Sequence, residues 1–172
     1  MTEILNLEIK ARTNNIVEIR RYLQKNCTEF LGIDHQKDTY FKIPKGRLKL
    51  RQGNIENSLI YYFREEVAGI KQSNINLVKV MPNSGMEELL RNSNGILTVV
   101  NKKREIYFIE NVKFHIDEVD GLGFFVEIEA IDEVGKFQAE ELREQCSKFI
   151  SLFKINSQEM IKGSYSDMTL EA

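Results

Sequence analysis

The 172-residue sequence has little of several features that mark specialised classes of protein. Its two cysteines, Cys27 and Cys146, are too few for a disulfide framework, and no apolar run reaches the length of a membrane span. No basic stretch followed by a long apolar run stands at the start, so we expect no signal peptide. Prolines number only two, and there is no Ser/Gly-rich linker and no internal repeat. We therefore expect a cytoplasmic protein with free thiols and a single domain over residues 1–172.

Familiar motifs of phosphate, metal and nucleophile chemistry are also missing. The sequence has no G-x-x-x-x-G-K-[ST], no G-x-G-x-x-G, no H-E-x-x-H and no elbow-type nucleophile. The two histidines, His35 and His115, are interpreted as ordinary polar or core residues. Lys and Arg number 24 against 26 Asp and Glu, which argues against binding of bulk nucleic acid or an acidic membrane surface. A local concentration of charge remains compatible with that balance.

What the chain does contain is alternation of polar and apolar residues with period two. In residues 5–12, Asn6, Glu8, Lys10 and Arg12 alternate with apolar residues, which is typical of a strand with one apolar face. Similar patterns predict strands over 46–52, 59–65, 76–81, 95–104, 105–109, 111–118 and 123–131. The dipeptides 53–54, 101–102 and 120–121 are predicted to form hairpin turns between them.

Helices are predicted to be fewer. Asn15 with Glu18 three residues later resembles a capping box at the start of a helix. Residues 86–91 form a short candidate, and residues 136–153 have the strongest apolar stripe. A further short piece is predicted near 157–162. About eight strands and three or four helices indicate an α+β fold, mainly antiparallel β.

The polar faces of these strands carry an unusual number of cations. Two interpretations stay open at this point. One is a set of solvated strand faces, where Lys and Arg guard sheet edges. The other is a closed barrel whose interior holds a ligand, because eight antiparallel strands can close on themselves. Many confined cations would repel one another in an empty barrel, so this second interpretation needs a polyphosphate, with a divalent cation at the few carboxylates.

An ordered set of segments resembles the CYTH domain of the triphosphate tunnel metalloenzymes, and in particular its class IV adenylyl cyclase-like branch. Asn6-Leu7-Glu8-Ile9-Lys10 resembles the E-x-E-x-K strand that opens this domain. The further matching segments are Asp38-Thr39-Tyr40-Phe41, residues 46–51, Leu59-Ile60 with Arg64, residues 69–73, 97–104 and 115–123, Glu127-Ile128-Glu129, and residues 163–167. Each piece alone is weak, but the ordered set spans nearly the whole chain.

This resemblance implies a closed eight-stranded antiparallel β-barrel, the triphosphate tunnel, with helices packed outside. It implies Mg²⁺ or Mn²⁺ as the cofactor, held by Glu8, Asp117, Glu127 and Glu129. Phosphate-binding residues carried over by position are Lys10, Lys49, Arg51, Arg64, Lys79, Lys102, Arg104 and Lys113. Lys10 and Tyr40 are the implied catalytic residues.

Two departures from the family pattern bear on mechanism. Asn6 replaces the first Glu of E-x-E-x-K, and an amide brings no charge, so one metal is expected to bind more weakly. Some triphosphatase relatives pair a Tyr with a Lys to activate water. Tyr40 stands at the Tyr position, but its expected partner position holds Arg64, which stays protonated and cannot serve as a base.

The leading expectation is a metal-dependent enzyme acting on a triphosphate, either as an adenylyl cyclase or as a hydrolase. The substrate is then ATP, thiamine triphosphate or inorganic triphosphate, and the protein is a monomer or a homodimer. A non-catalytic module that binds or senses a phosphorylated ligand is the alternative, favoured by Asn6. A structural domain with exposed basic strand faces is the third interpretation.

Overall fold

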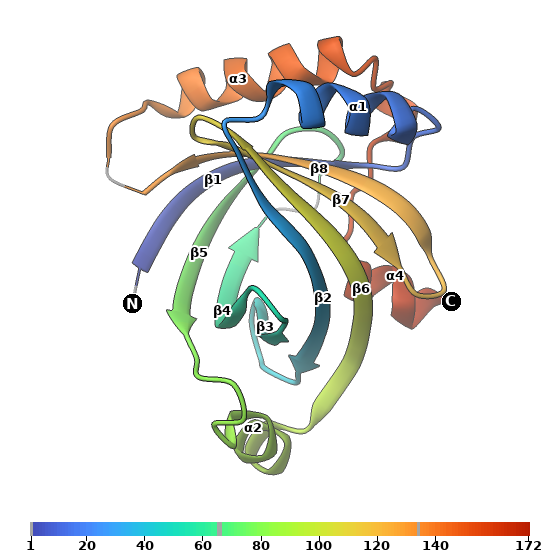
Figure 1. The fold of residues 1–172 in the computed structure, drawn as a ribbon. Coiled ribbons are helices and arrows are strands. Elements are labelled where there is room, and N and C mark those ends of the chain that lie inside the picture. Colours follow the sequence, from blue (N-terminus) through green and yellow to red (C-terminus); the bar gives the residue numbers. More distant parts are fainter. Residues whose placement is uncertain (1, 65–66, 134) are drawn as a thin grey trace.

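The fold of this protein is known from a computed structural model, which describes residues 2–64, 67–133 and 135–172, without the side chains of residues 2–4 and 64. Eight antiparallel strands form a closed barrel in the order β1-β5-β4-β3-β2-β6-β7-β8 (Figure 1). Their bounds are β1 (Thr2–Ala11), β2 (Glu29–Phe41), β3 (Arg47–Gln52), β4 (Asn57–Arg64), β5 (Lys71–Lys79), β6 (Ile96–Ile109), β7 (Val112–Val119) and β8 (Gly123–Asp132). The predicted fold class is confirmed.

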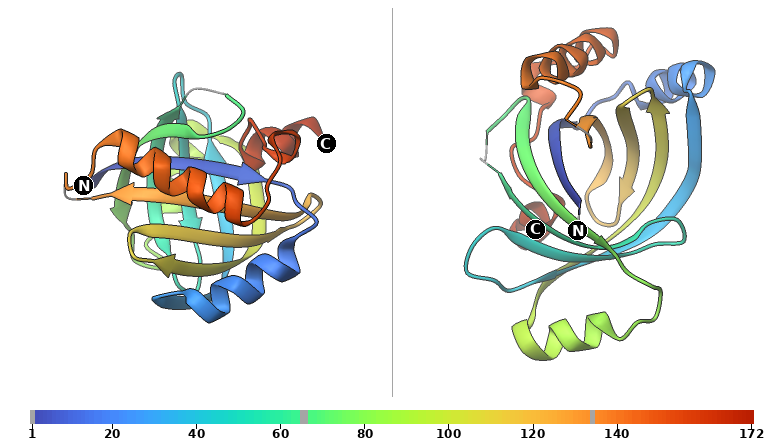
Figure 2. Two further views of the ribbon diagram at one scale, coloured as in Figure 1. Left: turned by 90° about the horizontal axis from the view of Figure 1, so that it is seen from above. Right: turned by 90° about the vertical axis from the view of Figure 1, so that its left-hand side faces the viewer.

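Four α-helices lie outside the barrel. They are α1 (Ile16–Asn26), α2 (Met86–Asn94), α3 (Ala139–Leu152) and α4 (Tyr165–Glu171), with a short 3₁₀ turn at Ser157–Glu159. Figure 2 shows α1 and α3 on one side of the barrel, whereas α2 lies at the opposite side. In the described part of the chain, no helix has both the length and the apolar content that crossing a membrane requires.

The main hydrophobic core lies outside the barrel, between its wall and the helices α1 and α3. The outward faces of β1, β7 and β8 contribute Leu7, Phe114 and Ile128, all fully buried. The ring of Phe149 on α3 meets that of Phe114 edge to face, with 4.7 Å between centroids. Because strand side chains alternate, the residues between these apolar positions must point into the barrel. The period-two pattern of β1 therefore places Glu8 and Lys10 inside.

Strand β2 and the continuity of β6 were not predicted. The two predicted strands 95–104 and 105–109 are one strand, β6, so the hairpin turn predicted at 101–102 is wrong. Strand β2 lacks a clean alternation because its first residues are exposed and its pairing with β6 shifts between Phe30 and Gly32. Gly32 takes a φ of 122°, as expected for a bulge. The turn predicted at 120–121 is confirmed between β7 and β8.

The helices also differ in detail from their prediction. Helix α1 begins after Asn15 as expected, but the Asn15 side chain makes no capping hydrogen bond. The amide N–H of Asn15 instead donates to the Thr13 hydroxyl at 3.3 Å. Helix α4 was not predicted, because its seven residues are too few to establish an apolar stripe. A capping box between Ser164 and Asp167 fixes its first turn.

Gly46, directly before β3, offers a test of how tightly the barrel wall is packed. Gly46 and Gly121 take nearly equal φ values of 77° and 75°. A Cβ on Gly46 would lie 2.9 Å from the backbone oxygen of Tyr62, whereas a Cβ on Gly121 would meet nothing within 4 Å. We expect Gly121→Ala to lower the free energy of unfolding by about 1 kcal/mol and Gly46→Ala by more, since Tyr62 belongs to a paired strand. Equal losses in urea unfolding would contradict this.

Candidate functional site

A pocket inside the barrel gathers most of the residues that the resemblance singled out. Six cations and three carboxylates line it, together with Tyr40, and they come from β1, β2, β3, β6, β7 and β8. These charged residues are Lys10, Lys49, Arg51, Lys102, Arg104, Lys113, Glu8, Glu127 and Glu129. Two other predicted residues lie elsewhere: Lys79 is exposed at the end of β5, and Asp117 is buried away from the pocket lining. The side chain of Arg64 lies outside the described residues.

Asp38 is the centre of one group of cations. Its carboxylate accepts hydrogen bonds from Lys102 at 2.8 Å, from Lys49 at 3.0 Å, and from the Arg51 guanidinium at 2.9 and 3.0 Å. Burial disfavours its charged form, but Arg51, Lys102 and Lys49 hold the pKa of Asp38 well below its usual range. Asp38 on β2 thereby joins three cations from β3 and β6.

Lys102 is the most perturbed of these cations. Its side chain is fully enclosed, and burial lowers its pKa from 10.5 to about 7, against the attraction of Asp38 and with the repulsion of Arg51 and Arg104. The attraction of Asp38 offsets only part of the cost of burying a positive charge at this position. An entering anion would favour its charged form, so Lys102 is suited to bind a phosphate oxygen.

Arg104 is held in a second group. The Arg104 guanidinium donates to both oxygens of Asp117, at 2.7 and 2.6 Å, and to Glu127 at 2.8 Å. The Tyr165 hydroxyl on α4 donates to the same Asp117 carboxylate at 2.6 Å. Because both of its oxygens are engaged, Asp117 orients Arg104. The resemblance implies that Asp117 also binds the metal, and that role stays a prediction. Lys10 lies 3.1 Å from Glu127 and 3.6 Å from the Tyr165 ring centroid.

Glu56 balances the remaining cations. It lies in the connection between β3 and β4, and its carboxylate accepts from Lys113 at 2.5 Å and from Arg51 at 3.0 Å. All six pocket cations therefore have a carboxylate partner within hydrogen-bonding distance. The sequence predicted many cations and a few carboxylates in the barrel, but it assigned neither Asp38 nor Glu56 a role in balancing the cations.

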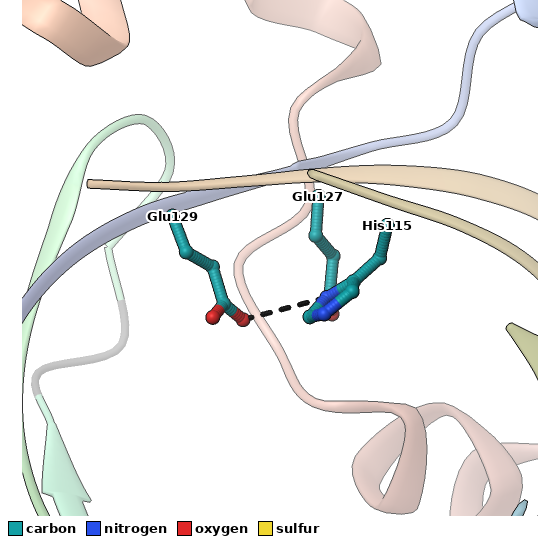
Figure 3. A group of neighbouring side chains, drawn as sticks. All are labelled: His115, Glu127 and Glu129. Carbon is teal, nitrogen blue, oxygen red and sulfur yellow. Dashed lines mark hydrogen bonds and ion pairs between the residues drawn. The ribbon is translucent and has the colours of Figure 1, made fainter. Parts of the chain in front are cut away.

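Two of the pocket carboxylates form a cluster with a histidine (Figure 3). His115, Glu127 and Glu129 each offer a ligand atom, and the three atoms lie within 4.8 Å of one another. Burial, together with the neighbouring Glu127 and Glu8, raises the pKa of Glu129 to about 7. A carboxylate that resists ionisation beside two others fits a site for a divalent cation, whose charge would reverse that effect. The His115 pKa is lowered to about 3, mainly by burial and by Arg104, so the ring is neutral at pH 7.

Asn6 lies beside this cluster at the position where the family pattern has a Glu. Its side chain is buried, and its Nδ2 donates to Glu8 Oε2 at 3.2 Å. The other amide atom, Oδ1, has no hydrogen-bond partner among the described residues. Asn6 therefore orients Glu8 and adds no charge to the cluster.

The two strands β4 and β5 give the pocket a different wall. Their lining side chains are Ile60, Tyr62, Ser73, Ile75 and Leu77. Among the described side chains of these two strands that line the pocket, none carries a charge. The pocket thus has a charged part and a mostly apolar part.

Sequence reasoning missed four residues of this site. His115 and Asp38 lie on strands at the same parity as predicted site residues, so the alternation did contain a signal for them. Glu56 comes from a loop and Tyr165 from a helix, where no strand periodicity exists. Only their positions in the closed barrel connect them with the cations.

The raised pKa of Glu129 predicts a pH dependence of stability without metal. A proton binds the folded state more tightly than the unfolded state, so this contribution is lost as pH rises from about 4.5 towards 7. We expect Glu129→Gln to gain stability relative to the unmodified protein over that range, by about 2 kcal/mol at pH 8. Urea unfolding in chelator at pH 5 and pH 8 measures this, and Glu118→Gln, exposed on the outer face of β7, is the control. A pH-independent difference would contradict the assignment.

Comparisons with known proteins agree with the barrel fold. The family model for the CYTH domain matches residues 5–165. A protein of Methanocaldococcus jannaschii, named as a candidate adenylate cyclase, is 23% identical over 176 residues, covering 96% of this chain and 98% of the relative.

Two solved structures share the fold. One is a protein from Pyrococcus horikoshii, with a TM-score of 0.74 and 23% identity over 94% of this chain and 98% of that one. Another is a candidate adenylyl cyclase from Hippeastrum, described as having a dominant triphosphatase activity, with a TM-score of 0.65 and 13% identity over 94% and 91% of the two chains. Since the family model matches most of the chain, this protein belongs to the CYTH domain family, whose members bind triphosphate substrates and depend on metal.

Proposed function

We propose that this protein is a metal-dependent enzyme that acts on ATP, forming cyclic AMP and pyrophosphate as a class IV adenylyl cyclase does. The observation that carries the proposal is the presence, in one pocket, of six cations and a separate cluster of carboxylates. Cations suit the phosphate chain, and carboxylates suit the divalent ion that accompanies it.

The residues that would hold Mg²⁺ or Mn²⁺ are Glu127 and Glu129, with Glu8 across the strand pair from Glu129. The donor set fits, because the carboxylates are buried together and the raised pKa of Glu129 reports the lack of a compensating charge. When bound, such an ion lowers the negative charge of an attacking oxygen and of the phosphoryl group under attack.

The phosphate chain would replace carboxylates as the partner of the cations. Lys49, Arg51 and Lys102 gather on Asp38, and their guanidinium and ammonium groups can turn to phosphate oxygens without crossing the pocket. Their task in the cyclase reaction is to stabilise the pyrophosphate that leaves when the ribose 3′-oxygen attacks the α-phosphorus. Asp117 and Tyr165 keep Arg104 oriented towards the same space.

The uncharged wall supports an organic triphosphate over inorganic triphosphate. Ile60, Ile75 and Leu77 offer contacts that a nucleoside can use and that a bare phosphate chain cannot. ATP would place its phosphates against the cations and its nucleoside against β4 and β5.

Hydrolysis of the terminal phosphate is the second candidate function. Tyr40 lines the pocket, and Lys49 Nζ lies 5.5 Å from the centroid of its ring. A Tyr and a Lys therefore lie close together. The Lys stands at position 49, whereas the resemblance indicated position 64 for the partner of Tyr40. In that reaction water attacks the terminal phosphorus, with the same cations holding the chain. A non-catalytic binding module is the third possibility, and it predicts binding without product.

A product assay distinguishes these functions. The protein is incubated with Mn²⁺ or Mg²⁺ and either ATP, thiamine triphosphate or inorganic triphosphate, and cyclic nucleotide is resolved from released phosphate. We expect cyclic AMP from ATP, and a loss of at least a hundredfold in rate for Glu127→Ala and Glu129→Ala, since both would hold the metal. Glu118→Ala should keep full activity, because Glu118 is exposed on the outside of the barrel. Phosphate release alone would favour the hydrolase, and thermal stabilisation without product the binding module.

The uncharged wall gives a separate prediction about substrate binding. Leu77→Ser should raise the KM for ATP roughly tenfold, because the nucleoside loses its contact with one apolar side chain. Competition by inorganic tripolyphosphate, measured as its inhibition constant, should stay within twofold, since that ligand uses only the cations. If both constants change equally, the nucleoside does not lie against β4 and β5.

A further inference from the structure

We propose that His115 is a nitrogen ligand of the metal in this pocket, so that the site prefers Mn²⁺ to Mg²⁺. This inference rests on the proposed function, because it concerns the metal that such an enzyme would use. The observations that carry it are the closeness of one imidazole nitrogen to two carboxylates and the burial of the other ring nitrogen without a partner.

The barrel places the imidazole at one end of the carboxylate cluster, beside Glu127. His115 on β7 is the direct cross-strand partner of Glu127 on β8, and Lys113 is the partner of Glu129. His115 Nδ1 lies 2.9 Å from Glu127 Oε2 and 3.6 Å from Glu129 Oε1. Figure 3 shows the ring and both carboxylates converging on one space inside the barrel wall.

The hydrogen bonds of the cluster leave the imidazole with an unused lone pair. Glu127 accepts from Arg104 at 2.8 Å and lies 3.1 Å from the Lys10 ammonium, so it is a carboxylate and can only accept. The ring proton therefore lies on Nδ1, facing Glu127, and Nε2 carries the lone pair. Nε2 is buried and has no hydrogen-bond partner among the described residues. Leaving a buried acceptor unsatisfied costs on the order of 1–3 kcal/mol, so the tautomer with its proton on Nδ1 gains little from the burial of Nε2.

The nitrogen that faces both glutamates is Nδ1, so a metal shared with them would take the lone pair of Nδ1, with the ring proton on Nε2. Moving the proton between Nδ1 and Nε2 changes the tautomer and leaves the charge of the ring unchanged. Coordination therefore needs no additional acid or base. The residue at the first Glu position of the family pattern, Asn6, uses its Nδ2 to bind Glu8, and its Oδ1 has no hydrogen-bond partner among the described residues, so Asn6 can add only a neutral oxygen ligand beside His115.

Nitrogen in the ligand set changes which metal the site prefers. Mg²⁺ takes oxygen ligands almost exclusively and keeps several waters, whereas imidazole suits transition metals. Replacing one anionic oxygen ligand by a neutral nitrogen also lowers the charge of the site, which weakens a hard cation most. The carboxylates Glu127 and Glu129 still suit Mn²⁺, so we expect the site to bind Mn²⁺ at least tenfold more tightly than Mg²⁺.

The direct test is electron spin-echo spectroscopy of the protein loaded with Mn²⁺, with and without inorganic tripolyphosphate. We expect ¹⁴N modulation from a coordinated imidazole. The chain has only two histidines, and His35 is exposed on the outer face of β2, so His35→Gln is a matched control that should keep the signal. His115→Gln should lose it, and should also reduce the preference for Mn²⁺ over Mg²⁺ at least tenfold in calorimetry.

A second measurement avoids any dependence on the folding of the His115 variant. In the His35→Gln background, histidine labelled with ¹⁵N should replace the ¹⁴N pattern by a ¹⁵N pattern. Nitrogen modulation that is absent from the loaded protein, or that persists in folded His115→Gln, would overturn the proposal, as would a failure to bind Mn²⁺ under both conditions.

The outcome for His115 is separable from the outcome for the enzyme. Cyclic AMP formation with Mn²⁺ but without nitrogen coordination would retain the proposed function and reject the ligand. Nitrogen coordination without any product from ATP would retain the ligand and reject the function.

Discussion

The structure depends on a buried carboxylate, Asp38, that holds Lys49, Arg51 and Lys102 together inside the barrel. Removing charges from water is costly, and a barrel interior lined by cations needs anions at close range to remain folded. Asp38 supplies such an anion for β3 and β6, as Glu127 and Asp117 do for Arg104 and as Glu56 does for Lys113. The same pairing leaves the cations in place for a more highly charged ligand.

This arrangement reverses the two faces of the barrel wall, with charged side chains inside and apolar side chains outside. The charged pocket occupies the interior, so the apolar faces of β1, β7 and β8 point outwards and need a cover. Helices α1 and α3 provide it, and the contact of Phe149 with Phe114 is part of the resulting core. The helices thus stabilise the strands that carry Lys10, His115, Glu127 and Glu129, without contributing to the chemistry themselves. Tyr165 on α4 is different, because its hydroxyl reaches Asp117 inside.

Within the pocket, three kinds of wall meet: the cations on Asp38, the carboxylates with His115, and the uncharged side chains of β4 and β5. Under the proposed function, each is suited to one part of a metal complex of ATP. The separation matters for selectivity, since a phosphate chain, a divalent ion and a nucleoside would each meet groups of complementary chemistry. On the carboxylate side, the neutral side chains of Asn6 and His115 lie next to Glu8 and Glu127.

Alternation with period two is a local property, and it determined from the sequence alone which residues of most strands point into the barrel. Glu8, Lys10, Lys49, Arg51, Lys102 and Arg104 followed from that parity and from the ordered family segments. Strand β2 was missed because its bulge and exposed first residues disturb the pattern, and the predicted break in β6 was wrong. Strand register decided that Asp38 neutralises its cations and that His115 meets two glutamates, and tertiary packing decided that Glu56 reaches Lys113 and that Tyr165 reaches Asp117. Local periodicity gives the face of a side chain but not its partner across the strands.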